Sequence, residues 1–213
     1  MKDLSNYRKS YEKSELTESS LPNNPLALFE LWFKEAEDLH GADEVNAMTV
    51  STIGPDGYPK SRIVLLKRFG QDGFVFFTNY KSDKGKSIAA NPKVCLSFFW
   101  PGTQRQVIIK GIAQKTSVEV SDAYFNSRPE GSRLGAIASN QSEVIESRAV
   151  IEEKLRQAEL EYSGKEIPRP EHWGGYLVNP VEFEFWQGGK DRLHDRIEYK
   201  RDGNDWFTER LSP

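Results

Sequence analysis

One short stretch of the chain, FWQGGKDRLHDR at residues 185–196, combines residue types that could do chemistry. It places His194, one of three histidines, midway between Arg192 and Arg196. In a β-strand, side chains two residues apart share a face, so the three would form one cationic row and build a site. In a helix, Arg192 and Arg196 would still meet but His194 would point elsewhere, which would build only a charged surface. A turn at residues 188–189, after which the chain re-enters a sheet near Arg192, favours the strand.

A second group of residues could bind a phosphate. A helix predicted over residues 116–128 puts Tyr124 and Arg128 four residues apart on one face, with Ser132 shortly beyond it. A guanidinium matches phosphate oxygens bidentately, and hydroxyl groups add further hydrogen bonds. An ordinary surface tyrosine–arginine pair has the same spacing, so the sequence leaves both interpretations open.

A third candidate is the lysine-rich stretch KSDKGKSIAANP at residues 81–92. It is typical of a short helix with Ser82 as its N-cap. Lys84 and Lys86 then lie near the helix N-terminus, where free N–H groups favour an anion. A solvated, lysine-rich turn is the alternative.

Arg62 and Lys67 bracket the apolar, strand-like stretch SRIVLLK. Their odd separation puts them on opposite faces of a strand. Either they serve different ligands or one of them lies at the rim of a site.

The composition sets limits on the function. The chain has 213 residues, of which 37% are hydrophobic and 29% charged, and a mean hydropathy of −0.65. No apolar run approaches the roughly 20 residues of a membrane helix, and the N-terminus has no apolar signal core, so we expect a cytoplasmic protein with no membrane partner. The net charge of −3 argues against a general nucleic-acid binder, which must neutralise phosphates. The single cysteine, Cys95, lies in the apolar stretch VCLSFFW and is expected to be buried and inert.

Other common chemistries leave no trace in the sequence. His40, His172 and His194 are far apart and lack the spacing of metal ligands, so no metal is expected. The chain has no GxSxG, P-loop or GxGxxG motif. The remaining cationic and hydroxyl side chains suit the binding of phosphorylated planar molecules.

Strand-like stretches separated by short turns dominate the chain. Such stretches lie at residues 46–53, 60–67, 74–78, 94–100, 104–115, 175–178, 181–187, 195–201 and 205–211. Strands joined by turns, not by helices, predict an antiparallel sheet that closes as a barrel, in a mostly β fold with flanking helices (α+β). Residues 1–24 are polar and are expected to form a mobile arm, followed by a single domain at residues 25–213.

Helical patterns interrupt the strands at three places. They predict helices over residues 25–41, which end on a glycine, over 116–128 and over 142–164. The second helix would begin with a capping box formed by Thr116 and Glu119.

The C-terminal stretch GGYLVNPVEFEFWQGGKDRLHDR resembles the signature of the pyridoxamine (pyridoxine) 5′-phosphate oxidase family. The central match is FEFWQ at residues 183–187, four intervening residues, and RLHDR at residues 192–196. Further segments resemble the family in the same order along the chain: SRIVLLK, FFTNYKS, QRQV, YFNSRPEGSRLGA and SNQS. The resemblance covers residues 20–213.

This resemblance implies a fold and a reaction. The fold would be an FMN-binding split β-barrel that works as a homodimer, with both active sites at the subunit interface. The reaction would oxidise the 4′ position of pyridoxine 5′-phosphate or pyridoxamine 5′-phosphate to the aldehyde, pyridoxal 5′-phosphate. FMN would take the hydride, and O2 would reoxidise the flavin to give hydrogen peroxide.

The resemblance also implies which residues form the site. FMN would be bound by Arg62, Ile63, Val64, Leu65, Leu66, Lys67, Phe77, Thr78, Lys84, Gln106, Gln141, Ser142, Trp186 and Arg196. The substrate phosphate would be held by Lys67, Tyr124, Arg128 and Ser132. Arg192 and His194 would face the pyridine ring as the catalytic pair, and Arg8 and Tyr11 would fold over the substrate.

Asp83 departs from the family pattern, because an arginine is expected beside Lys84. An acidic residue there should weaken binding of the flavin phosphate by like-charge repulsion, unless it caps the short helix. Two other functions stay open. One is a split-barrel flavin reductase or oxidase with a different substrate, and the stretch FWQGGKDRLHDR argues against it. The other is a carrier that stores a flavin or pyridoxal phosphate.

Overall fold

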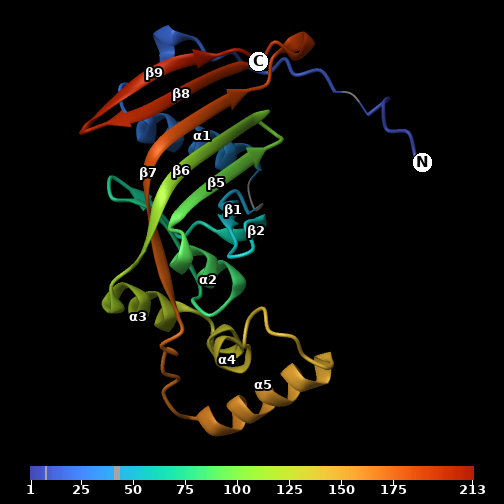
Figure 1. Cartoon of the computed structure of the whole chain (residues 1–213), viewed down its shortest axis with the longest axis vertical. Helices are drawn as coiled ribbons and strands as arrows, with labels where there is room; N and C mark the ends of the chain where they lie inside the picture. Colours follow the sequence, from blue (N-terminus) through green and yellow to red (C-terminus); the bar gives the residue numbers. More distant parts are fainter. Residues whose placement is uncertain (8, 41–43) are drawn as a thin grey trace. The chain divides into compact units, whose positions relative to one another are not determined.

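The structure is a computed structural model that describes residues 1–7, 9–40 and 44–213, with the side chain of residue 40 excepted. The chain divides into two compact units (Figure 1). Unit 1 comprises Met1–Thr49, Cys95–Gly111 and Pro180–Pro213, and unit 2 comprises Val50–Val94 and Ile112–Asn179. A single domain over residues 25–213 stays a prediction.

The described strands form one sheet with the order β2-β1-β5-β6-β7-β4-β3, and β8 pairs with both β7 and β9. The ladders β3/β4, β4/β7, β7/β8 and β8/β9 are antiparallel. These findings confirm the predicted antiparallel sheet. The strands are β1 (Ala47–Ile53), β2 (Pro59–Leu65), β3 (Arg68–Gly70), β4 (Gly73–Asn79), β5 (Lys93–Trp100), β6 (Arg105–Lys115), β7 (Trp173–Gln187), β8 (Asp195–Asp202) and β9 (Asp205–Leu211).

Strand β7 corrects one prediction, because it is continuous where the sequence indicated two strands at 175–178 and 181–187. Its first part pairs with β4 up to Val178, and its pairing with β8 begins at Glu182. Pro180 lies between these two ladders, so its missing N–H removes no hydrogen bond from either of them. Proline also holds the residue before it in extended geometry, which lets the strand continue.

The core of unit 1 is aromatic. Helix α1 (Pro25–His40) buries Phe29 and Trp32 against the sheet. The ring centroids of Phe29 and Phe98 are 5.2 Å apart, and those of Trp32 and Phe185 are also 5.2 Å apart. Edge-to-face pairs of this kind add to the free energy of apolar burial. The glycine stop predicted for this helix lies outside the described residues.

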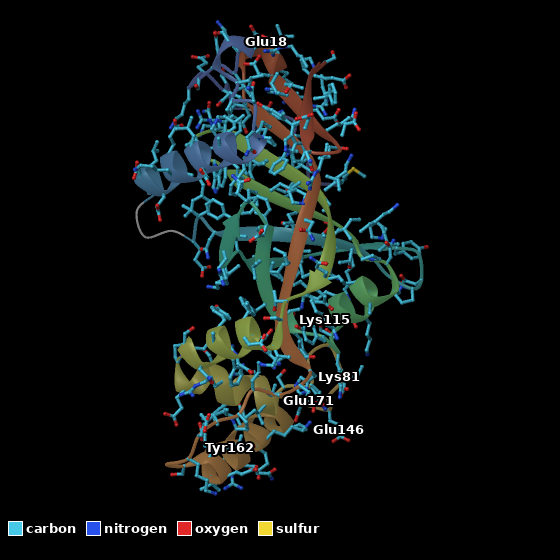
Figure 2. All side chains as sticks on the ribbon, turned by 90° about the vertical axis from the view of Figure 1, so that its left-hand side faces the viewer. Glu18, Lys81, Lys115, Glu146, Tyr162 and Glu171 are labelled. Carbon is cyan, nitrogen blue, oxygen red and sulfur yellow. The ribbon has the colours of Figure 1, made fainter. Side chains whose placement is uncertain are left out.

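The N-terminal segment of unit 1 makes specific contacts beyond its first ten residues. The Leu16 side chain is buried, and the Leu16 amide donates to Asp195 Oδ2 at 2.9 Å. Glu18, in the 3₁₀ helix Glu18–Ser20, pairs with Arg210 Nε at 2.5 Å (Figure 2). A mobile arm over residues 1–24 stays a prediction.

Four helices belong to unit 2: α2 (Asp83–Ala90), α3 (Val118–Ser127), α4 (Glu130–Ala138) and α5 (Arg148–Tyr162). Helix α4 was not predicted, because Pro129 reads as a helix stop although it also serves as the N-cap of a new helix. A buried cluster joins α3, α4 and α5 to the start of β7, and Tyr162 packs against it (Figure 2). The buried members of this cluster are Phe125, Leu134, Ala158, Ile167 and Trp173.

Two helix starts differ from the prediction. The N-cap of α3 is Ser117, whose hydroxyl accepts from the Val120 amide at 3.3 Å, so the Thr116/Glu119 capping box is wrong. Helix α5 begins at Arg148 and not at residue 142. Ser142 has a φ of 74°, a left-handed conformation that a right-handed helix cannot include.

Two further expectations concern the surface. Cys95 is partly buried, not fully buried, and burial raises the pKa of its thiol, as expected of an unreactive cysteine. No helix within the described ranges is long and apolar enough to cross a membrane.

Gly175 in β7 allows the close packing that positions the pocket of unit 2. A Cβ there would lie 2.7 Å from Thr116 Oγ1 and 2.9 Å from Phe77 Cε1. The Gly175 carbonyl also accepts from the Thr116 amide at 2.9 Å and from the Tyr80 hydroxyl at 3.0 Å. A residue without a side chain is therefore required at this point.

We expect Gly175→Ala to destabilise the protein by about 1–3 kcal/mol, because the added methyl group would push Thr116 and Phe77 apart in a packed interior. Urea unfolding measures this change in the free energy of unfolding. Gly131→Ala in α4 is the matched control, since a Cβ there meets no atom within 4 Å. Equal stability of the two variants would contradict the close approach at Gly175.

Candidate active site

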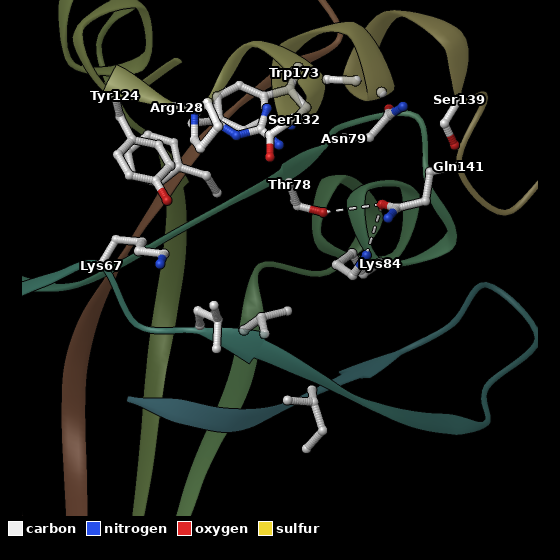
Figure 3. Close-up of a pocket in the computed structure, with 17 residues that line it drawn as sticks. Lys67, Thr78, Asn79, Lys84, Tyr124, Arg128, Ser132, Ser139, Gln141 and Trp173 are labelled. Atoms are coloured by element: carbon white, nitrogen blue, oxygen red, sulfur yellow. Dashed lines mark hydrogen bonds between the residues drawn. The ribbon is translucent and has the colours of Figure 1, made fainter. Parts of the chain in front are cut away.

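A cavity of about 710 Å³ lies in unit 2 (Figure 3). Strands β2, β4 and β7 and helices α2, α3 and α4 all contribute to its wall, so residues far apart in sequence meet there. The lining residues are Ile63, Val64, Leu65, Lys67, Phe77, Thr78, Asn79, Lys84, Tyr124, Arg128, Pro129, Ser132, Gly135, Ala136, Ser139, Gln141 and Trp173.

Lys84 places a buried positive charge at one end of this cavity. Helix α2 begins as predicted, with the Ser82 hydroxyl accepting from the Gly85 amide, which sets Lys84 in the first turn. Lys84 Nζ donates to Gln141 Oε1 at 3.0 Å, and the Thr78 hydroxyl donates to the same oxygen at 3.4 Å (Figure 3). The residue is 8% exposed, and burial lowers the pKa of its ammonium group. A buried ammonium group held by a neutral amide favours an anionic ligand.

Arg62 and Asp83 lie outside the cavity lining. Arg62 Nη1 donates to Thr52 Oγ1 at 2.8 Å and to the Lys60 carbonyl at 2.6 Å. Asp83 does not provide the cap of α2, which Ser82 provides. Its carboxylate pairs instead with Lys60 Nζ at 2.5 Å, and that hydrogen bond lowers the pKa of Asp83. The negative charge of Asp83 is thus partly offset by a neighbour.

The four residues predicted to hold a substrate phosphate all line this cavity (Figure 3). The rings of Tyr124 and Phe77 stack with centroids 4.0 Å apart. Lys67 Nζ lies 6.0 Å from the centroid of the Tyr124 ring. Arg128 Nη1 is buried and has no hydrogen-bond partner, and burial lowers the pKa of this guanidinium. A half-buried guanidinium with an unsatisfied Nη1 atom, in the same cavity as Lys67 and Ser132, is suited to receive phosphate oxygens.

Several predicted cofactor residues do not line this cavity. Leu66 is buried in the core, and Ser142 lines a separate cavity of about 210 Å³. Gln106, Trp186 and Arg196 belong to unit 1.

The sequence reasoning also missed part of the cavity wall. Gly135, Ala136 and Ser139 were missed because α4 was not predicted. The signal for α4 was a proline followed at once by an acidic residue, which is typical of a helix start. The other lining residues that were not predicted are Asn79, Pro129 and Trp173.

The cationic row predicted for Arg192, His194 and Arg196 is wrong. Residues 190–192 form a short 3₁₀ turn, in which Arg192 has a φ of 64°, and β8 begins only at Asp195. A left-handed backbone cannot belong to a strand, so the period-two spacing does not apply. Only Arg196 lies in the strand, where its Nε donates to Glu184 Oε1 at 2.8 Å.

Arg192 and His194 nevertheless share a second cavity, which lies in unit 1 and measures about 220 Å³. Tyr11 lies there too, with its ring centroid 5.7 Å from that of Trp186 and 6.1 Å from that of His194. The predicted partner of Tyr11, Arg8, lies outside the described residues. The full lining is Lys9, Ser10, Tyr11, Gly189, Asp191, Arg192 and His194.

One hydrogen bond determines the state of the His194 ring. The Gly189 amide donates to His194 Nδ1 at 3.1 Å. Since Nδ1 accepts this bond, it carries no proton, and the neutral ring carries its proton on Nε2. Burial, and then the nearby charge of Arg192, lower the pKa of His194. His194 is therefore held as a neutral hydrogen-bond donor.

No group of three or more histidine, cysteine, aspartate or glutamate side chains within the described residues is arranged to hold a metal ion.

The fold is that of the FMN-binding split-barrel proteins. PhzG from Burkholderia lata, solved in complex with tetrahydrophenazine-1-carboxylic acid, superimposes with a TM-score of 0.85 at 29% identity, covering 92% of this chain and 95% of that one. A pyridoxamine 5′-phosphate oxidase-related, FMN-binding protein from Nostoc punctiforme has the same fold, with a TM-score of 0.70 at 16% identity, and covers 91% of this chain and 100% of its own. The predicted fold class is confirmed.

The chain belongs to the pyridoxamine 5′-phosphate oxidase family, whose model matches residues 34–162. Residues 173–213 match a model described as the pyridoxine 5′-phosphate oxidase C-terminal dimerisation region. A Flavobacterium johnsoniae protein named pyridoxine/pyridoxamine 5′-phosphate oxidase is 65% identical over 213 residues, all of both chains. A protein of the same name from Christiangramia forsetii is 54% identical and covers 100% of this chain and 99% of its own length.

We expect His194 to titrate below the ordinary histidine value of 6.5 in an NMR titration of ¹⁵N-labelled protein. A lowered folded-state pKa means that the contribution of this group to stability is present above the unfolded pKa and is lost as the pH falls. The ¹⁵N shifts should also place the proton of the neutral ring on Nε2. Arg192→Met should raise the pKa, and a value at or above 6.5 in the wild type would contradict the arrangement.

Proposed function

We propose that the protein oxidises pyridoxamine 5′-phosphate and pyridoxine 5′-phosphate to pyridoxal 5′-phosphate, with FMN as cofactor and O2 as electron acceptor. The names of the full-length relatives support this reaction. The observation in the structure that carries it is a pair of cations in one cavity, the buried Lys84 and the half-buried Arg128, whose Nη1 atom is buried without a hydrogen-bond partner. Two phosphorylated molecules, a flavin and a pyridine, supply the two anionic groups that such a cavity needs. The reaction would serve the biosynthesis and salvage of vitamin B6.

The residues of unit 2 fit a flavin mononucleotide. Lys84, supported by Gln141 and Thr78, would pair with the FMN phosphate. The β2 residues Ile63–Leu65 supply one wall of the cavity, against which a planar ring system could lie. When bound, FMN supplies the two-electron redox chemistry, and O2 restores its oxidised form with release of hydrogen peroxide.

The phosphate of the substrate would be held by Lys67, Tyr124, Arg128 and Ser132. These side chains would fix the position of the pyridine ring, which raises the rate by orienting the reacting carbon. Because these groups bind the substrate away from the reacting atom, loss of one of them should raise KM more than it lowers kcat.

Arg192 and His194 would face the pyridine ring. Because His194 Nδ1 accepts from Gly189, its Nε2–H is set to donate a hydrogen bond to a ring oxygen or nitrogen. Nδ1 could accept a proton only after that hydrogen bond is lost. We therefore assign to His194 the orientation of the pyridine ring, and to the guanidinium of Arg192 the stabilisation of charge on that ring. The match to a C-terminal dimerisation region supports a homodimer as the working form.

A purified sample tests the proposed function directly. We expect a yellow protein that releases one hydrogen peroxide for each pyridoxal 5′-phosphate formed from pyridoxamine 5′-phosphate. A yellow protein that makes no peroxide with either phosphorylated substrate would favour an oxidase or reductase for another substrate. A protein that binds pyridoxal 5′-phosphate without turnover would favour a carrier.

We expect Arg192→Met to lower kcat by about tenfold or more while leaving FMN bound, because the side chain is proposed to act on the substrate and not on the flavin. Methionine keeps an unbranched, apolar stem and removes the charged guanidinium. Steady-state peroxide release and the flavin absorbance of the purified variant measure the two effects. A kcat equal to that of the wild type at saturating pyridoxine 5′-phosphate would remove Arg192 from the mechanism.

We expect Asp83→Asn to strengthen FMN binding about threefold at low salt, since it removes a partly exposed negative charge next to Lys84. Titration of flavin-free protein with FMN, followed by flavin fluorescence, gives the dissociation constant. The gain should shrink at high salt, because exposed charges are screened. Asp72→Asn, in the exposed turn before β4, is the matched control, and FMN binding that is unchanged or weaker in Asp83→Asn would contradict the proposed repulsion.

A further inference from the structure

Arg128 is held by aromatic rings and not by an acid. Its guanidinium carbon lies 4.5 Å from the centroid of the Trp173 ring and 5.7 Å from that of Phe125. Within the described residues Arg128 forms no salt bridge, and its Nη1 atom is buried without a hydrogen-bond partner. Pro129 restricts the backbone of Arg128 to its extended conformation, with φ −75° and ψ 149°. The direction of this side chain therefore depends on the ring beneath it.

Trp173 is itself held rigidly. It is the first residue of β7, pairs with Asn79 of β4, and is 7% exposed. Its amide donates to the Pro170 carbonyl at 2.9 Å, and its carbonyl accepts from Arg169 Nη1 at 2.6 Å. Its ring meets Phe125 edge-on, with centroids 5.2 Å apart. Both the backbone and the ring of Trp173 are thus fixed.

The same ring is part of a stack that continues to Tyr124 (Figure 3). Trp173 lies nearly parallel to Phe77, with centroids 5.6 Å apart and an interplanar angle of 12°. Phe77 in turn stacks on Tyr124 at 4.0 Å. Tyr124 lies in the last turn of α3 and Arg128 directly follows that helix, and the ring pair of Phe77 and Trp173 contacts both side chains.

We propose that Trp173 is a positioning residue that holds the Arg128 guanidinium in the cavity so that it can receive the phosphate of the substrate. The proposal deepens the proposed function and rests on it. Trp173 would contact the phosphate only through Arg128, and its effect would be confined to ligands that carry a phosphate.

The chemistry of arginine explains why a ring is suited to this task. A guanidinium is planar and stacks on an aromatic face while its N–H groups stay free in the plane for phosphate oxygens. An acidic partner would occupy those N–H groups and would repel the phosphate. A side chain already held in its binding direction loses less conformational freedom when the ligand arrives.

Kinetics of FMN-loaded variants test this proposal. We expect Trp173→Leu to raise KM for pyridoxamine 5′-phosphate about tenfold, the size of a partly desolvated cation–π contact, with kcat within about twofold of the wild type. Inorganic phosphate, used as a competitive inhibitor, should show the same tenfold rise in its inhibition constant. Trp173→Phe keeps an aromatic face and should recover most of the affinity. FMN affinity should stay within about twofold of the wild type in both variants.

Trp206→Leu is the matched control, because Trp206 in β9 of unit 1 also lies under an arginine, Arg201, at 6.0 Å. We expect wild-type KM and phosphate inhibition there. Unchanged KM and phosphate inhibition in Trp173→Leu would overturn the proposal, and so would a fall in kcat with KM unchanged.

A second variant covers the case in which Trp173→Leu does not fold. Arg128→Lys keeps the charge but loses the planar stack, so it should also raise KM and the phosphate inhibition constant about tenfold. Where Trp173→Leu folds, its effect and that of Arg128→Lys should not add in the double variant, as expected of residues in contact. Wild-type binding in Arg128→Lys would overturn the proposal. If the wild type releases no peroxide, the proposed function fails, and calorimetric binding of inorganic phosphate to the same variants still decides the role of Trp173.

Discussion

Burial of positive charge without a salt bridge is the constraint on which the cavity of unit 2 depends. Neither Lys84 nor Arg128 forms a salt bridge within the described residues, and burial lowers the pKa of both groups. Such charges cost free energy unless a ligand neutralises them. The surrounding residues keep these charges in place, through the amide of Gln141 in one case and the ring of Trp173 in the other. A phosphorylated ligand would therefore stabilise the folded chain as it binds.

The sheet could be predicted from local patterns, and the departures have local causes. Strand β9 begins and ends where alternation and turn residues indicated, at Asp205 and Leu211. The break predicted in β7 is wrong, because Pro180 lies between two ladders. Where these ladders end is determined by tertiary pairing and not by the local sequence. Helix α4 was missed because Pro129 was interpreted only as a helix stop, although it is also the N-cap of α4. Helix α5 could not begin at residue 142, as predicted, because Ser142 is left-handed, and no local pattern marked this conformation.

Site residues could be predicted where the residue types of a family motif identify them. They could not be predicted where the backbone geometry determines which side chains meet. The resemblance to the family named Lys67, Tyr124, Arg128 and Ser132, and the structure brings them to one cavity. Period-two spacing failed for the arginine–histidine row, because spacing rules hold only inside a regular element. Trp173 carried no sequence signal, since a tryptophan at the start of a strand more often belongs to a core. Trp173 lies under Arg128 because the start of β7 packs with helices α3, α4 and α5 in one buried cluster.

The turn before β8 has a consequence for how this protein can change. Asp191 and Arg192 are consecutive residues with left-handed backbones, with φ 54° and 64°. Each such non-glycine residue costs about 1–2 kcal/mol relative to an ordinary conformation. A glycine at either position would relieve that strain, but at position 192 it would also delete the side chain proposed to meet the substrate. Selection for thermal stability and selection for turnover therefore oppose each other at position 192, whereas at position 191 stability can be gained without loss of that side chain.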